Sequence, residues 1–295
     1  MLTLEHLATL LETHRAAAAL PVKEFAVGGK MLPFNTRPTL MGVVNLSADS
    51  WYRESVCLTT EAAVQRGRVL AAQGAAVVDV GAESTLAHAA RVDDAAQSAR
   101  LLPVIQALRA ADIPVSVETY SPRVTRQCLE AGASVLNLTG TQDTEEIFRL
   151  VAAHDAAVIL CHVAGKNVRE TSEFDLRGDP LPMLRDFFAR QIENAQRQGV
   201  EKILLDPGLG FYYRNLPDGA ARVRHQMRIF LNTFRLRELG YPVCHALPHA
   251  FEFFREEVRC AEPFFAVLAA LGQTSLFRTH EIPRVRAVLE AMQTF

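Results

Sequence analysis

Short apolar runs alternate with longer amphipathic stretches along most of the chain, beginning at residue 39. The runs are rich in β-branched residues, and most are continuously apolar, which is typical of parallel strands buried on both faces. They predict eight strands, at residues 39–45, 75–81, 113–119, 133–138, 156–162, 201–207, 241–246 and 273–279. The stretches that follow them predict helices at about residues 60–73, 91–110, 122–131, 143–154, 181–198, 219–239, 250–271 and 282–293.

Strand-then-helix units repeated in this way favour an α/β fold of the (β/α)8 TIM barrel type. A doubly wound open sheet would have fewer strands and an early G-x-G-x-x-G motif, whereas the glycines of "LLDPGLGF" follow the sixth strand. No linker or low-complexity segment divides the chain, so we expect one barrel domain over residues 38–295. Residues 1–37 form an N-terminal extension, whose apolar spacing predicts an amphipathic helix.

The composition excludes several kinds of function. A formal net charge of -2 and an isoelectric point near 6.5 provide no basic surface for nucleic acid or anionic lipid. The five cysteines are scattered without C-x-x-C spacing, which argues against a disulfide framework and favours a reducing compartment. No apolar run is long enough to cross a bilayer, and the N-terminus lacks the apolar core of a signal peptide. We therefore expect a cytoplasmic protein without a membrane or nucleic-acid partner.

Polar or ionisable side chains stand at or just after the end of every predicted strand. In strand order they are Asn45, Asp79 with Glu83, Glu118, Asn137, His162, Asp206, His245, and Arg278 with His280. Any one of them alone is explained as a cap, a turn former or a structural group, as for Asn137 and His245. Together they favour a binding site, because barrel strands open onto one catalytic face and buried polar groups cost free energy unless paired.

The types of side chain indicate what this face binds. A carboxylate at Asp206, flanked by amide groups, can accept two parallel hydrogen bonds from a flat, guanidine-like edge, such as that of a pterin or guanine. Arg278 and His280 follow the last strand, where barrels of this type often bind phosphate. Asn45 opens the segment "NLSADS", whose oxygen-bearing side chains could share Mg²⁺ with a diphosphate. The same segment is equally a good turn and cap sequence.

Seven segments, in this order, resemble the dihydropteroate synthase family, a pterin-binding barrel of folate synthesis. They are "MGVVNLSADSW", "VVDVGAEST", "VSVETY", "VLNLTG", "LCHVAG", "LLDPGLGF" and "RTHEI". The resemblance extends from residue 38 to the end with its spacing preserved. It implies that the chain joins a 6-hydroxymethyl-dihydropterin diphosphate to an arylamine, that Mg²⁺ assists the departure of diphosphate, and that the protein is a homodimer.

The resemblance also implies roles for single residues. Those expected to hold the pterin are Asp79, Glu118, Asn137 and Asp206. Those expected to hold the diphosphate are Asn45, Arg278 and His280. Glu118 and Asp206 are expected to be catalytic, and Asn45 is also the expected ligand of Mg²⁺. Glu118 replaces the family's aspartate on the third strand, and its extra methylene displaces the acid group that steadies the developing positive charge.

The sequence departs from the family pattern around the second substrate. Leu247, Pro248 and His249 replace the family's Ser-Arg-Lys run after the seventh strand. His249 is expected either to be solvated or to substitute in part for the lysine. In the loop after the second strand, Ser84 and Thr85 are retained, but the family's arginine and proline are not. The losses therefore lie on the arylamine side, whereas the pterin and diphosphate side is kept.

Three functions are compatible with this pattern. The first is a synthase whose arylamine is not p-aminobenzoate, such as the ribosylated aminobenzene of tetrahydromethanopterin-type coenzymes. The second is a catalytically inactive pterin-binding paralogue or regulator. The missing lysine and arginine favour it, and so does the first loop, where "WYRES" replaces a family segment whose glycines serve a mobile lid. The third is a methyltransferase that uses a methyl-tetrahydropterin and needs no phosphate-binding side chains. Asn45, Arg278 and His280 favour the first function, because a diphosphate is the ligand that they serve.

Overall fold

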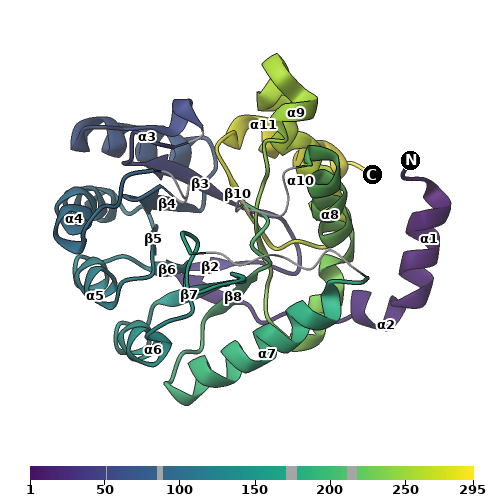
Figure 1. Ribbon diagram of the computed structural model, residues 1–295, viewed down its shortest axis with the longest axis horizontal. Helices are drawn as coiled ribbons and strands as arrows, with labels where there is room; N and C mark the ends of the chain where they lie inside the picture. The colour runs from purple at the N-terminus through teal and green to yellow at the C-terminus, as the bar shows by residue number, and fades with distance from the viewer. Residues whose placement is uncertain (51, 85–88, 171–177, 211–217) are drawn as a thin grey trace.

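A ring of parallel strands forms the centre of the molecule, and helices surround it (Figure 1). The computed structural model describes the chain except for residues 51, 85–88, 171–177 and 211–217. Neighbouring strands follow the order β8-β7-β6-β5-β4-β3-β10-β9. Leu205 and Val243 bridge the two outer strands, and the backbone N–H of Leu205 donates to the carbonyl of Pro242 at 3.0 Å. The predicted (β/α)8 barrel is therefore confirmed.

All eight predicted strands are present, each inside its predicted range. They are β3 Thr39–Asn45, β4 Val77–Gly81, β5 Val115–Thr119, β6 Val135–Leu138, β7 Ala157–Cys161, β8 Ile203–Asp206, β9 Cys244–Ala246 and β10 Leu276–Thr279. Most begin later than predicted, because the turns that end the preceding helices use the first residues of each apolar run. The carboxyl ends, which carry the polar side chains, agree closely with the prediction.

Most of the predicted helices are also confirmed. The helices around the barrel are α3 Thr60–Ala72, α4 Asp94–Ala110, α5 Pro122–Glu130, α6 Thr144–Ala153, α7 Leu181–Arg197, α8 Gly219–Asn232, α10 Ala261–Leu271 and α11 Ile282–Met292. The helix predicted from residue 91 begins only at Asp94, because the Asp93 side chain accepts the N–H of Ala96 and caps the first turn. In the described residues, no helix is both long enough and apolar enough to cross a bilayer.

Two predicted helices are interrupted. The helix predicted at 219–239 ends at Asn232 and continues as a 3-10 helix, η2 Thr233–Leu239. The one predicted at 250–271 is divided into α9 Phe251–Phe254, η3 Arg255–Cys260 and α10. Its backbone breaks at Arg255, where φ is +45°, a value that L residues seldom adopt. This break starts α10 afresh at Ala261 and places Glu262 in its first turn.

The N-terminal extension contains the predicted helix and a hairpin that was not predicted. Its elements are α1 Leu4–Thr13, α2 Arg15–Ala18, β1 Phe25–Val27 and β2 Lys30–Leu32. Gly28 and Gly29 join the two strands, and both have positive φ (55° and 79°), as a tight hairpin turn requires.

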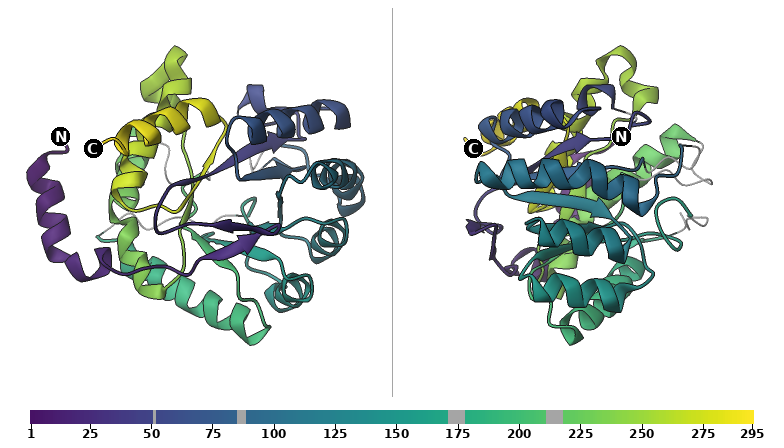
Figure 2. Two further views of the ribbon diagram at one scale, coloured as in Figure 1. Left: turned by 180° about the vertical axis from the view of Figure 1, so that it is seen from behind. Right: turned by 90° about the vertical axis from the view of Figure 1, so that its left-hand side faces the viewer.

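The hairpin closes the amino-terminal end of the barrel. Seen from behind, it lies across the centre of the ring (Figure 2, left). Its apolar side chains, with those that flank it, are Val22, Phe25, Val27, Leu32 and Phe34. They pack against Met41, Val77 and Val135, which come from the early parts of three strands. The carboxyl ends of the strands are thus left as the open face. The division into an extension and a barrel domain at residue 37 stays a prediction.

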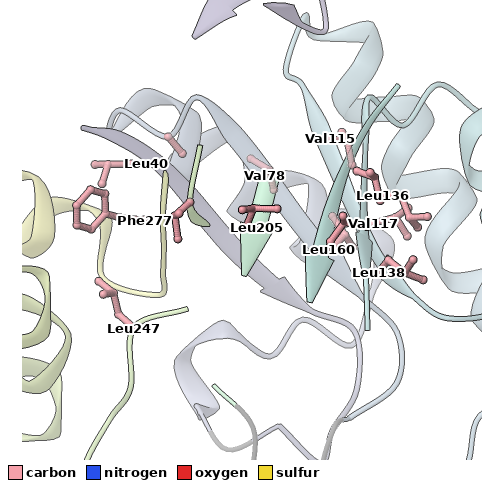
Figure 3. Packing of buried hydrophobic residues seen from close by; sticks show 14 of the residues in the cluster. Leu40, Val78, Val115, Val117, Leu136, Leu138, Leu160, Leu205, Leu247 and Phe277 are labelled. Atoms are coloured by element: carbon pink, nitrogen blue, oxygen red, sulfur yellow. The ribbon is translucent and has the colours of Figure 1, made fainter. Parts of the chain in front are cut away.

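Side chains along each strand alternate between the helices and the barrel interior. Leu205 belongs to the large cluster that packs between strands and helices, together with Val78 and Leu160 (Figure 3). Leu204, one residue earlier, belongs instead to the cluster inside the barrel. Asp206 lies two residues after Leu204, so the same alternation directs its carboxylate into the interior. The core packing of the strands therefore determines which polar side chains face the site.

Candidate active site

A cavity of about 280 Å³ lies at the carboxyl ends of the strands, the face where barrels of this kind place their active sites. The predicted site residues that line it are Asn45, Ser84, Glu118, Asn137, Asp206, His249, Arg278 and His280. Asp79 is fully buried and contacts Arg278 behind the cavity wall. Thr85 lies outside the described residues. The barrel therefore brings together side chains that are far apart in the sequence.

Two of the strand-end histidines do not face this cavity. The ring of His162 stands edge-on to Phe187 of α7, with centroids 4.8 Å apart, and Nε2 of His245 lies 2.7 Å from Oγ1 of Thr233. Burial lowers the pKa of His162 to about 4 and that of His245 to about 3, so both rings are neutral near pH 7. The interpretation that all eight strand ends converge is wrong for these two, which point toward the helices.

Arg278 is the centre of the polar network in the barrel interior. Its Nε donates to Oδ2 of Asp79 at 2.7 Å, and one terminal nitrogen donates to Oε2 of Glu118 at 2.8 Å. The amide nitrogen of Asn137 also donates to Oδ2 of Asp79, at 3.2 Å. The longer side chain of Glu118 thus reaches the arginine without a distortion of its strand. One guanidinium thus holds both carboxylates through charge-assisted hydrogen bonds.

The carboxyl groups of Glu118 and Asp206 ionise near neutral pH. Burial raises the pKa of Glu118 to about 7, although the neighbouring Arg278 acts in the opposite direction. Burial likewise raises the pKa of Asp206 to about 6, opposed by the backbone N–H of Gly208, which donates to Oδ1 at 2.8 Å. Both groups can therefore accept or release a proton at physiological pH, as acid–base catalysis requires.

We expect the stability of the ligand-free protein to fall as the pH rises from about 4.5 to 7, because of Glu118. Its folded-state pKa exceeds its ordinary value, so the folded state holds the proton more tightly and loses stability when that proton leaves. One such group changes the free energy of unfolding by at most about 1.4 kcal/mol per pH unit. The free energy of unfolding, measured by urea denaturation at several pH values, should change less steeply with pH in Glu118→Gln than in the wild type. An equal pH dependence in the two proteins would contradict the raised pKa of Glu118.

Asn45 is oriented by two serine hydroxyls. Its amide nitrogen donates to Oγ of Ser50 at 2.9 Å and to Oγ of Ser55 at 2.6 Å, so the amide oxygen is the atom suited to a ligand. Ser47 also lines the cavity, whereas the Asp49 carboxylate accepts the N–H of Ala90 at 3.4 Å. An amide oxygen and a hydroxyl fit Mg²⁺ when phosphate oxygens and water complete its coordination. The donor set is therefore compatible with an ion shared with a bound diphosphate.

Four side chains form a group at the edge of the cavity, here called the rim cluster: Tyr52, His249, Glu262 and His280. The ring of His249 stacks on Tyr52, with centroids 4.8 Å apart and an interplanar angle of 22°. His249 is 15% exposed, so the expectation that it is solvated is wrong. Glu262 is 1% exposed, and its Oε1 lies 2.7 Å from Nδ1 of His280. Glu262 and Tyr52 were not predicted as site residues, because each resembles an ordinary surface residue in the sequence.

The loop after β4 is attached to the segment after β7. Arg169 is 8% exposed and donates to the carbonyls of Ser84 and Ala89, both at 2.6 Å. Glu83 accepts the hydroxyl of Tyr120 at 2.7 Å. Ser84 is therefore held at the cavity wall by a buried arginine from another strand-end segment. No motif identified Arg169, since its partners are backbone carbonyls that any residue could supply.

The cavity wall near β9 is largely apolar. Its apolar members are Leu209, Leu247, Pro248 and Phe251. Arg222 of α8 also lines the cavity, and its guanidinium forms an ion pair with Glu252. Among the described residues, this wall therefore combines apolar side chains with an arginine that is already paired with a carboxylate.

Comparisons with known proteins agree with this geometry. A family model described as pterin binding enzyme matches residues 41–247. A dihydropteroate synthase of Synechocystis sp. is 32% identical over 221 residues, which are 74% of this chain and 73% of that protein. A dihydropteroate synthase of Clostridium beijerinckii is 31% identical over 224 residues, which are 74% of this chain and 76% of that protein.

Solved structures show the same architecture. The dihydropteroate synthase of Xanthomonas albilineans with 4-aminobenzoic acid has a TM-score of 0.77 and 29% identity, over 92% of this chain and 98% of that chain. The same enzyme in complex with 7,8-dihydropteroate has a TM-score of 0.72 and 27% identity, over 92% and 97% of the two chains. The likeness extends well beyond the residues that match the family model.

Proposed function

We propose that this chain, which belongs to the dihydropteroate synthase family of pterin-binding enzymes, condenses a 6-hydroxymethyl-dihydropterin diphosphate with an arylamine other than p-aminobenzoate. The family supports the class of transferase, and the site supports the choice of arylamine. The observation that carries the proposal is the contrast within one cavity. Its interior keeps the family's acids, amide and arginine, whereas Leu247, Pro248 and His249 stand where the family has Ser-Arg-Lys.

The interior of the cavity suits the pterin ring. Asp206 would accept two parallel hydrogen bonds from the 2-amino group and the adjacent ring N–H, and such donors favour its ionised form. Asn137 is held in one orientation, because its nitrogen donates to Asp79 and its oxygen accepts the thiol of Cys161 at 3.5 Å. A fixed amide beside a carboxylate gives the site a defined pattern of donors and acceptors. That pattern selects the ring and its orientation.

The diphosphate would lie toward Arg278 and His280. Arg278 uses Nε and one terminal nitrogen for Asp79 and Glu118, while the other terminal nitrogen has no hydrogen-bond partner among the described residues. Arg278 can therefore bind a phosphate oxygen without releasing both carboxylates. Mg²⁺, held by the amide oxygen of Asn45 and by phosphate oxygens, would neutralise charge on the leaving diphosphate. Glu118 would steady the positive charge at the pterin methylene while the amine attacks.

The arylamine would lie against the apolar wall. 4-Aminobenzoic acid, found in the Xanthomonas albilineans structure, carries a carboxylate that needs a polar partner. In this chain Leu247 and Pro248 offer none, and Arg222 is already paired with Glu252. A neutral substituent would make better contact with this wall. The ribosylated aminobenzene of tetrahydromethanopterin-type coenzymes is an amine of that kind.

An arylamine panel tests this proposal. Purified protein is incubated with the pterin diphosphate, Mg²⁺ and either p-aminobenzoate or a neutral para-substituted aniline, and the released diphosphate is measured. We expect the neutral amine to react at least about 10-fold more efficiently, a difference that corresponds to about 1.4 kcal/mol. Faster release with p-aminobenzoate would contradict the choice of amine. Absence of release with every amine would contradict the transferase itself.

A pterin-binding protein without transferase activity is the second candidate. It is favoured by the ion pairs that already occupy Arg278 in the ligand-free protein, together with the missing lysine. Calorimetry with 6-hydroxymethylpterin and with its diphosphate separates the two functions. A transferase should bind the diphosphate more tightly, whereas equal affinity would favour the inactive binder. A methyl-tetrahydropterin methyltransferase ranks below both, because it makes no use of His280 or Asn45.

A further inference from the structure

The rim cluster contains a second group of metal-ligating side chains, separate from Asn45. His249 follows β9, Glu262 lies in the first turn of α10, and His280 follows β10. One ligand atom from each can be chosen so that all three lie within 4.8 Å of one another. Nε2 of His249 is 3.3 Å, and Nδ1 of His280 is 2.7 Å, from the same oxygen of Glu262. Three elements that are distant in the sequence therefore bring their donor atoms close together.

The two distances to Glu262 are close to those in a metal centre. Zn²⁺ binds imidazole nitrogen and carboxylate oxygen at about 2.0–2.1 Å, so neighbouring ligand atoms of a tetrahedral site lie roughly 3.3 Å apart. The separation of His249 from Glu262 has that value, and His280 needs a shift of about half an ångström. Nε2 of His249 is buried and has no hydrogen-bond partner among the described residues, although it faces the carboxylate at 3.3 Å. This nitrogen is therefore available to bind an ion.

Contacts outside the three ligands orient them. The other oxygen of Glu262, Oε2, accepts the hydroxyl of Thr279 and the backbone N–H groups of His280 (3.0 Å) and Glu281 (3.1 Å). Oε1 is thereby turned toward the two imidazoles. Tyr52 lies against both rings, with centroids 4.8 Å from each. Such surrounding contacts fix the direction of ligand atoms before an ion arrives.

The carboxylate of Glu262 lies inside the cluster. Its side chain is 1% exposed, and its Oε1 lies 3.3 Å from Nε2 of His249 and 2.7 Å from Nδ1 of His280. A carboxylate buried in this way is costly unless a positive charge is paired with it. A divalent ion between these atoms would supply that charge and accept the nitrogen lone pairs.

We propose that His249, Glu262 and His280 bind one divalent transition-metal ion of the Zn²⁺ class at the edge of the cavity. Two imidazoles and one carboxylate are ligands for Zn²⁺, Fe²⁺ and Mn²⁺, and they leave coordination positions open. His249 and His280 line the cavity, so those open positions face it. The ion would stand where the family has a lysine and would replace that residue's positive charge. It is distinct from Mg²⁺ at Asn45, because Mg²⁺ prefers oxygen ligands.

Metal titration of the full-length protein tests the site without any substrate. After removal of metal with EDTA, Zn²⁺ is titrated in the presence of excess Mg²⁺ and followed by calorimetry, and Co²⁺ is added as a spectroscopic probe. We expect one saturable Zn²⁺ site and the visible absorption of a histidine-bound Co²⁺. His249→Ala should lower the Zn²⁺ affinity by more than the ~10–100-fold that loss of an outer contact costs. Exposed His154 provides the matched control, since His154→Ala should bind Zn²⁺ as the wild type does.

A second variant separates loss of metal from loss of folding. His249→Lys places the family's residue at this position, and a protonated lysine cannot ligate Zn²⁺. We expect it to keep the wild-type circular dichroism and to lose the Zn²⁺ site. Absence of saturable Zn²⁺ binding by the wild type, or unchanged Zn²⁺ affinity in folded His249→Lys, would overturn the proposal. Neither result depends on a pterin or an arylamine, so the transferase reaction is tested separately.

Discussion

Asp206→Asn is expected to remove most of the affinity for the pterin while leaving the fold intact. The substitution replaces the acceptor of two charge-assisted hydrogen bonds, each worth about 1.5–3 kcal/mol. The dissociation constant for 6-hydroxymethylpterin should therefore rise by roughly 100-fold or more. The barrel should tolerate the change, because the asparagine oxygen can still accept the N–H of Gly208, which Asp206 accepts at 2.8 Å. Calorimetry with the free pterin measures the effect.

Glu201→Gln is the matched control for this experiment, since Glu201 is an exposed acid just before the same strand. It should bind the pterin as the wild type does. Asp206→Asn should also unfold at the wild-type temperature or slightly above it, because burial raises the pKa of Asp206 and its ionised form is costly. Pterin binding within about threefold of wild type would contradict the role of Asp206, as its two bonds exceed that difference.

Arg278→Met is expected to destabilise the whole protein as well as its site. Arg278 is the partner of Asp79 at 2.7 Å and of Glu118 at 2.8 Å, and its side chain is only 15% exposed. Removing one member of a buried ion pair leaves an uncompensated charge and costs about 3–5 kcal/mol. The free energy of unfolding in urea should fall by about that amount at pH 8. The affinity for the pterin diphosphate should fall as well, because a phosphate ligand is lost.

The pH dependence of this destabilisation identifies its cause. Arg278 lowers the pKa of Glu118, so in Arg278→Met that pKa should rise further. Glu118 would then stay protonated to a higher pH, and the loss of stability should be smaller at pH 5 than at pH 8. Arg278→Met combined with Glu118→Gln should recover part of the stability, because the effects of substitutions at interacting residues are not additive. A loss that is equal at both pH values would show that packing, not charge, is responsible.

The strands and most of the site follow directly from the sequence. A continuous apolar run needs burial on both faces, and only the inside of an α/β fold provides it for so many strands. The two-residue alternation then fixes the inward direction of Asp206 once Leu204 faces the interior. By the same alternation, the side chains of Arg278 and Thr279 point to opposite sides of β10, and His245 points toward the helices. The sequence therefore predicted which strand-end side chains line the cavity, except that His162 and His245 point toward the helices and Asp79 lies behind the wall.

Other parts needed the three-dimensional structure. The hairpin β1–β2 has strands of three residues, too short for a hydrophobic period, although its Gly28–Gly29 pair is a turn signal that could have located it. Glu262 could not be assigned to the site, because the helix is interrupted at Arg255, where φ is positive, and this interruption decides where the helix of Glu262 begins. The pairing of Arg278 with Glu118 joins residues 160 positions apart and depends on closure of the ring. Contacts of this kind leave no local pattern.

A crystal structure with bound 6-hydroxymethyl-dihydropterin diphosphate would show directly whether the open end of the barrel holds the pterin and its diphosphate. We expect the amino edge of the ring to lie within hydrogen-bond distance of Asp206, Asn137 to contact the same ring, and the diphosphate to lie beside Arg278. A pterin bound outside the barrel mouth, or turned so that its amino edge faces away from Asp206, would contradict this expectation.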